Sequence, residues 1–130
     1  MMPNNRDLRL EKYDISTNRY RELKYFCMQY REKQSRLRSI TEIASFSGDC
    51  NSSGKISDRT ANVAMQRMQL EKDIDLIEKS AMEADEELYP YIISNVADGI
   101  PYEYLWAPTS RTSFYALRRK FFLILNHKKQ

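Results

Sequence analysis

Apolar residues recur along this chain at alternating steps of three and four residues, in two long segments separated by a polar stretch. The first series consists of Tyr20, Leu23, Cys27, Tyr30 and Leu37, with the polar Gln34 in the same register. The second consists of Val63, Leu70, Ile74, Ile77, Ala81 and Leu88, with Arg67 interrupting it. Such steps place residues on one face of an α-helix. The pattern therefore predicts two long amphipathic helices.

Polar residues that cap helices stand before each predicted helix. Ser16 or Thr17 suits the first helix, and Ser57 or Asp58 suits the second. Residues 47–57 between them are rich in serine and contain two of the three glycines, which predicts a linker. Residues 40–46 either continue the first helix or form a short separate turn. We expect residues 16–84 to form a coiled-coil-like antiparallel hairpin, preceded by a flexible arm at residues 1–15.

Prolines and a glycine divide the region that follows. Pro90 interrupts a helical pattern and predicts either a kink or a fresh helix start, while Asp98-Gly99 is a turn signal that ends that helix. Pro101 suits the first turn of a short apolar helix that includes Trp106. Pro108 should end this short helix, because the residue before a proline is disfavoured in the α region.

A last helix should follow, capped by Thr109 or Ser110. Its apolar face is formed by Phe114, Leu117, Phe121 and Ile124. The opposite side carries Arg111, Tyr115, Arg118 and Arg119. Two helices joined by a tight connection are typical of a helix-turn-helix, whose second helix enters a DNA groove. The predicted fold is all-α, a long antiparallel helical hairpin followed by a C-terminal helix-turn-helix unit at residues 85–130.

Two stretches of this unit resemble a known family. Residues 99–105, G-I-P-Y-E-Y-L, resemble the entry to the helix-turn-helix of sigma-factor region 4 and of small phage regulators of the RinA and ArpU kind. Residues 113–125 resemble their recognition helix, with Phe114, Phe121 and Leu125 at core positions. The turn at residues 106–112 is shorter than in that family and lacks its Leu-Gly. The resemblance implies a phage- or prophage-encoded DNA-binding activator of late genes.

Charge is distributed unevenly along the chain. Residues 71–103 contain ten Asp or Glu against two Lys, whereas residues 104–130 contain six Lys or Arg and no acidic residue. A basic end of this kind is expected to meet a polyanion. The alternative is that the segments pair their charges with one another. The basic face of the first helix is either a solvated surface or a second phosphate-contacting surface.

The predicted DNA-binding residues lie at the start and middle of the last helix. Those expected to reach base edges or nearby phosphates are Ser110, Arg111, Thr112, Ser113 and Tyr115. Those expected to neutralise backbone phosphates are Arg118, Arg119 and Lys120.

The sequence offers no arrangement for catalysis or metal binding. The one histidine, His127, lies near the C-terminal end, and the two cysteines, Cys27 and Cys50, form no Cys/His cluster with it. Acidic residues one or two positions apart do not face one another on a helix, so they indicate a solvated face. We therefore predict no enzymatic activity, no cofactor and no metal. No apolar run is long enough for a membrane span, which predicts a cytoplasmic protein.

The expected partner is double-stranded DNA, and RNA polymerase is a further candidate. A homodimer through the apolar stripe of the hairpin is also expected. The alternative is a non-enzymatic helical module for protein–protein interaction, such as a phage inhibitor or adaptor of a host protein. In that case the basic C-terminal end would only add solubility.

Overall fold

The computed structural model describes residues 15–47 and 58–130, which form five α-helices and one 3₁₀ turn. The helices are α1 (Thr17–Met28), α2 (Tyr30–Ser47), α3 (Asp58–Ala84), α4 (Tyr89–Asp98) and α5 (Arg111–Lys128), with the 3₁₀ turn η3 (Tyr102–Tyr104) before α5. No strand occurs in these two ranges, so the predicted all-α class is confirmed. The predicted N-terminal arm, except for residue 15, and nearly all of the predicted linker lie outside the described residues.

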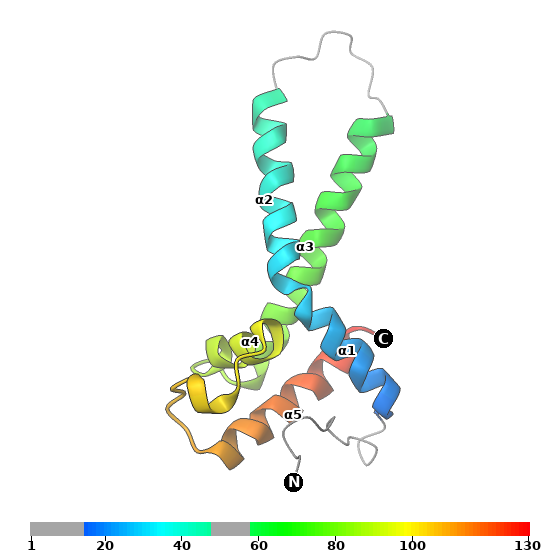
Figure 1. Ribbon diagram of the computed structural model, residues 1–130. Helices are drawn as coiled ribbons and strands as arrows, with labels where there is room; N and C mark the ends of the chain where they lie inside the picture. Colours follow the sequence, from blue (N-terminus) through cyan, green and yellow to red (C-terminus); the bar gives the residue numbers. More distant parts are fainter. Residues whose placement is uncertain (1–14, 48–57) are drawn as a thin grey trace.

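Helices α2 and α3 run side by side in opposite directions and project from a base (Figure 1). The base consists of α1, α4, α5 and the C-terminal half of α3. Near the base the two long helices are held together by the Tyr30 hydroxyl, which donates to Glu78 Oε2, and by a 2.8 Å ion pair between Lys33 and Asp73. Farther from the base the two helices separate (Figure 1).

The first predicted helix is broken at Gln29. Its start is as predicted, because the Ser16 side chain accepts a hydrogen bond from the Arg19 amide at 3.1 Å. At the break, the Gln29 amide bonds to the Phe26 carbonyl, three residues back, and the chain changes direction (Figure 1). The reason is tertiary packing: α1 contacts α4 and α5, whereas α2 runs along α3. Residues 40–46 continue α2, which decides between the two alternatives.

The turns before and after α4 are determined by residues within them. The Asp85 carboxylate accepts from the amides of Glu87 and Leu88 at 2.8 and 2.9 Å after α3 ends. Pro90 stands in the first turn of α4, where a missing N–H costs no hydrogen bond. Gly99 ends the helix with φ +70° and donates its amide to the Asn95 carbonyl. This left-handed conformation is the one that glycine adopts without steric cost.

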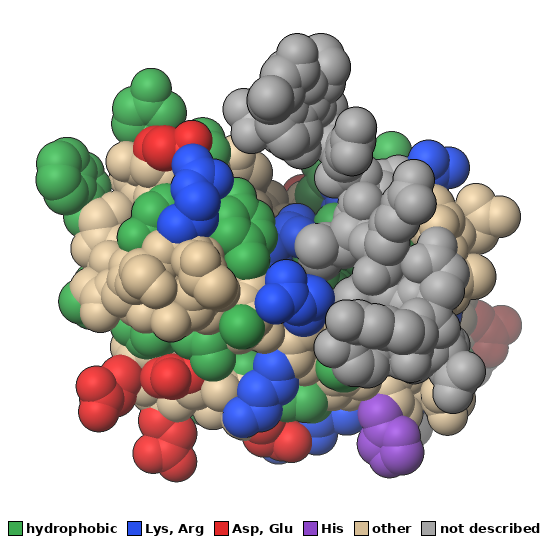
Figure 2. Space-filling view, turned by 90° about the horizontal axis from the view of Figure 1, so that it is seen from below, with side chains coloured by type: hydrophobic (Ala, Val, Ile, Leu, Met, Phe, Trp, Pro, Cys, Tyr) green, Lys and Arg blue, Asp and Glu red, His purple; other side chains and the backbone are tan. Residues whose placement is uncertain are grey.

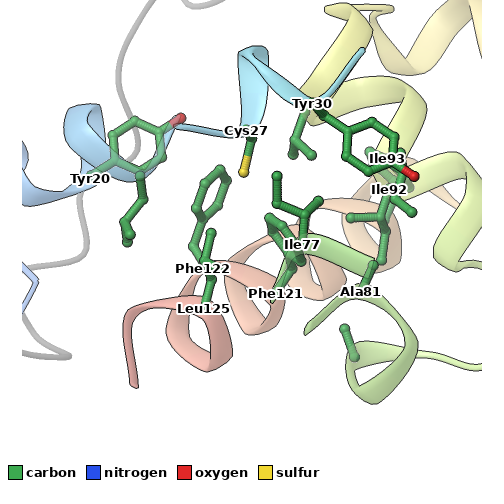
Figure 3. Close-up of a cluster of buried hydrophobic side chains, with 14 of the residues drawn as sticks. Tyr20, Cys27, Tyr30, Ile77, Ala81, Ile92, Ile93, Phe121, Phe122 and Leu125 are labelled. Carbon is green, nitrogen blue, oxygen red and sulfur yellow. The ribbon is translucent and has the colours of Figure 1, made fainter. Parts of the chain in front are cut away.

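The core forms where α5 lies across α3 and beneath α1. Figure 3 shows Phe122 pointing from α5 toward Tyr20 and Cys27 of α1, with Phe121 beside Ile77 of α3. The side chains in this cluster are almost completely buried, and each Phe contributes roughly 1.5–3 kcal/mol through burial. Burial raises the pKa of the Cys27 thiol to about 12, so this cysteine packs as an apolar group.

None of the described helices has the length and apolar character needed to cross a membrane.

Ser80 is a polar side chain in this apolar core. It is fully buried, and its Oγ has no hydrogen-bond partner within the described residues. An unpaired buried hydroxyl loses its hydration without compensation. Ser80→Ala is therefore expected to raise the free energy of unfolding by about 1 kcal/mol, measured by urea denaturation. A less stable variant would contradict this reading of the core.

Candidate nucleic-acid interface

The start of α5 is built as the sequence predicts. Ser110 has an extended backbone, and its hydroxyl accepts from the Ser113 amide at 3.1 Å. The Phe114 amide then bonds to the Ser110 carbonyl, and α5 runs on to Lys128. The N-terminal turn is exposed to solvent, including the side chains of Thr112 and Ser113.

The prediction of a short α-helix before Pro108 is wrong. Only the three-residue 3₁₀ turn η3 forms there, closed by a bond from the Leu105 amide to the Tyr102 carbonyl. Trp106 then takes a left-handed backbone with φ +56°, which breaks any helix. The helix that precedes α5 is therefore α4, and residues 99–110 connect the two as an extended turn.

The buried face of α5 is rotated relative to the predicted one. Phe114 and Phe121 are fully buried as expected, but Leu117 is only half-buried. Phe122, which the predicted face left out, is fully buried and meets the ring of Tyr20 edge to face, with the centroids 5.0 Å apart. The cause is α1, which packs on this side of α5.

Because of this rotation, Arg118 turns inward instead of lying opposite the apolar face. Its Nε donates to Asn95 Oδ1 at 2.6 Å, and one terminal nitrogen donates to the Tyr20 hydroxyl at 3.2 Å. Its guanidinium also lies 5.1 Å from the centroid of the Phe122 ring. Arg118 thus joins α1, α4 and α5, and it positions α5 within the base.

Arg111 is also engaged within the molecule. It forms a 2.7 Å ion pair with Glu103, and its guanidinium lies 5.5 and 5.8 Å from the ring centroids of Tyr102 and Tyr115. The pKa of Glu103 is lowered by its own backbone amide and then by Arg111. Arg111 remains half-exposed, but much of its charge is balanced by Glu103.

Four of the other predicted residues lie on the outward side of α5, whereas the Ser110 hydroxyl caps the helix and Tyr115 packs against Phe114 and Arg111. Thr112, Ser113 and Lys120 are exposed, and Arg119 is partly exposed beside them. Within residues 15–47 and 58–130, neither Arg119 nor Lys120 has an acidic partner. Figure 2 shows the underside of the base, where Lys and Arg side chains lie across the middle of the face and Asp and Glu side chains gather toward its lower left. This side of α5 is the basic surface that we consider as the nucleic-acid interface.

Sequence reasoning missed two features of this region. The first is the role of Asn95, whose side chain accepts from Arg118 and donates to the Ile100 carbonyl at 2.9 Å. The second is the exposure of Trp106, which the sequence assigned to an apolar helix. The closely spaced Pro101 and Pro108 were the signal that this segment is too short for an α-helix.

Among the described residues, no group of three or more His, Cys, Asp or Glu side chains could hold a metal ion.

Comparison of the chain with models of known protein families, with curated proteins and with solved structures finds no match in any of the three.

Removing the Arg118 side chain should destabilise the fold. In Arg118→Ala, Asn95 and Tyr20 lose a charged donor, so we expect the free energy of unfolding to fall by about 2 kcal/mol. Urea denaturation followed by circular dichroism measures the change. Lys120→Ala is the matched control, because it removes one positive charge from the exposed side of the same helix and should shift stability by less than about 0.5 kcal/mol. Equal stabilities for the two variants would contradict the positioning role of Arg118.

Proposed function

We propose that this protein is a sequence-specific DNA-binding regulator of transcription that contacts duplex DNA through the outward side of α5. The observation that supports this best is the pair Arg119 and Lys120, which lie on that side without an acidic partner in the described chain. Residues 104–130, which include the whole of α5, contain no Asp or Glu. A phosphate backbone approaching this helix would therefore meet no repulsive charge on it.

The contacts divide by side-chain chemistry. Arg119 and Lys120 neutralise backbone phosphates, which gives affinity without sequence preference. Thr112 and Ser113 are short and polar, and they reach base edges or nearby phosphates from the first turn of α5. Arg111 retains a half-exposed guanidinium at the border of this surface. Arg118 has a structural role instead, because its guanidinium donates hydrogen bonds to Asn95 and Tyr20.

The resemblance to phage regulators adds a narrower hypothesis. A late-gene activator encoded by a phage or prophage would bind its operator through α5 and contact RNA polymerase with another surface. A homodimer formed through the α2–α3 pair would present two copies of α5 to two half-sites of the operator.

Removing the two unpaired cations should weaken DNA binding and reduce its salt dependence. For Arg119→Ala/Lys120→Ala we expect at least tenfold weaker binding to duplex DNA. The slope of log affinity against log salt should become less negative by about 1.8, since each phosphate contact contributes about 0.9. Fluorescence anisotropy of a labelled duplex pool of random sequence, at several salt concentrations, measures both quantities.

The control for this experiment is Lys72→Ala/Lys79→Ala. It removes the same charge from α3, beside Lys128 near the C-terminal end of α5 rather than beside Arg119 and Lys120, and should leave the salt slope unchanged. If both double variants bind like the wild type, α5 is not the DNA-binding surface.

A second candidate function is a helical module that binds another protein. The observation that favours it is the exposure of Ile43, Met65 and Met68 on the separated ends of α2 and α3. Exposed apolar groups gathered on one part of a protein indicate an interaction surface. Failure of the wild-type chain to retain any duplex near physiological salt would favour this function over DNA binding.

A further inference from the structure

One stripe of α3 changes its character between the base and the far end of the helix. Its buried members near the base are Leu70, Ile74 and Ile77. Continued away from the base in steps of three and four residues, the same face carries Arg67, Val63 and Arg59. Two arginines therefore occupy positions of the stripe where apolar residues would close the hairpin.

These outer positions of the stripe are not covered by α2. Every residue from Asp58 to Gln69 is exposed, and Figure 1 shows the two helices drawing apart in this region. Val63 keeps 37% of its surface exposed, whereas Ile77 in the same stripe keeps none. The apolar surface of α3 is thus left uncovered where the arginines interrupt it.

The facing side of α2 is identified by its contact with α3. Lys33 points toward α3, because it pairs with Asp73 at 2.8 Å. Leu37 and Ile40 follow Lys33 by four and seven positions, so they lie on the same face of α2. Both are only partly buried. We call the uncovered residues of the two helices the open seam: Leu37, Ile40, Arg59, Val63 and Arg67.

The two arginines of the open seam account for the separation of the helices. Residues 59–70 of α3 and residues 33–41 of α2 contain no Asp or Glu. A closed seam would bury both guanidinium groups without a carboxylate to pair with them, which is strongly unfavourable. Neither Arg59 nor Arg67 forms an ion pair with any residue that the structure describes. The helices stay apart, and the arginines remain in water.

The open seam defines the chemistry of the partner that would cover it. Its apolar residues require an apolar face, and its arginines require carboxylates. Arg59 and Arg67 are eight residues apart, about 12 Å along α3, and acidic residues seven or eight positions apart on a neighbouring helix reproduce this spacing. The backbone of duplex DNA would supply negative charge, but it offers little apolar surface for Val63. The combination favours an amphipathic helix over nucleic acid.

We propose that the open seam binds an acidic amphipathic α-helix of another protein. This helix lies along α2 and α3 and completes a three-helix bundle. Its apolar stripe covers Leu37, Ile40 and Val63, and its Glu or Asp side chains pair with Arg59 and Arg67. The interaction adds a protein partner to the proposed DNA-binding function and does not depend on it, because α5 lies in the base, away from the far ends of α2 and α3 (Figure 1).

A synthetic acidic helix is the probe for this site. The peptide has three heptads, about 21 residues, with Leu at positions a and d and Glu at positions e and g. A matched peptide carries Lys at e and g instead. Fluorescence anisotropy with the full-length protein should show that the Glu peptide binds at least tenfold more tightly than the Lys peptide. Equal affinities, or no binding of the Glu peptide, would overturn the proposal.

Charge reversal locates the bound peptide. Arg59→Glu/Arg67→Glu should lose at least tenfold in affinity for the Glu peptide and gain affinity for the Lys peptide, with unchanged helix content by circular dichroism. The control is Met65→Ala/Met68→Ala, because these exposed residues lie on the opposite side of α3, and it should bind both peptides like the wild type. An unchanged preference in the arginine variant, or loss of binding in the methionine variant, would place the peptide outside the open seam and contradict the proposal.

The same arginine variant tests the choice of occupant. If a second copy of the chain fills the open seam, sedimentation equilibrium will show a dimer that Arg59→Glu/Arg67→Glu abolishes. If duplex DNA fills it, the salt slope of DNA binding will become less negative in this variant, as expected for Arg119→Ala/Lys120→Ala. Either result would overturn an acidic helix as the occupant. We expect the wild type and the arginine variant to have the same mass in solution and the same salt slope.

Replacement of the central arginine tests why the seam is open. Arg67→Leu restores the apolar stripe and should let the helices close, so the variant should unfold at a higher urea concentration than the wild type. Arg67→Gln removes the charge without adding an apolar group, and as the control it should gain less. A midpoint for Arg67→Leu at or below that of the wild type would contradict the role of the arginines in holding the seam open.

Discussion

The contact between Tyr20 of α1 and Phe122 of α5 determines how the rest of the base is arranged. The two residues are about a hundred positions apart, yet their rings meet edge to face at 5.0 Å. Arg118 bonds to Tyr20 and to Asn95, and so links this contact to α4. Arg19 adds a 2.7 Å hydrogen bond to Asn126 on the same pair of helices. These interactions set the rotation of α5 and therefore decide which of its side chains face solvent.

The break at Gln29 makes this contact geometrically available. A continuous helix from Thr17 to Ser47 would carry its first turns away from α5 if it followed α3 along its whole length. The change of direction lets α1 cover α5 while α2 runs along α3 (Figure 1). As a result, one amphipathic stripe in the sequence serves two different packing partners. Leu23 and Cys27 are buried in the base, whereas Tyr30 of the same stripe bonds to Glu78 between the long helices.

Features that depend on near neighbours could be predicted from the sequence. Ser16 and Ser110 cap helices, Pro90 starts one, and Gly99 ends one, because each effect acts within one helical turn. The buried positions of α3 from Leu70 to Ala81 follow from its spacing of apolar residues. The inward turn of Arg118 could not be predicted, since it needs Tyr20 and Asn95 to be brought to the same place. The same is true of the surface left to Arg119 and Lys120.

The exposure of Trp106 is a second feature that the hydrophobic pattern of the sequence could not predict. A tryptophan between Leu105 and Ala107 looks like part of an apolar helix, because hydrophobicity alone does not distinguish a buried ring from an exposed one. Its exposure follows from the short η3 turn and from a backbone conformation that only coordinates reveal.

The position of α5 after all of its packing partners in the sequence has a consequence for synthesis in the cell. Four side chains at the centre of the core, Phe114, Phe121, Phe122 and Leu125, are translated after α1, α3 and α4. Until they leave the ribosome, the apolar surfaces of α1 and α3 that pack on α5 stay uncovered. The base therefore cannot complete its core before α5 has emerged, and a nascent chain that stops short of α5 remains a target for chaperones and proteases.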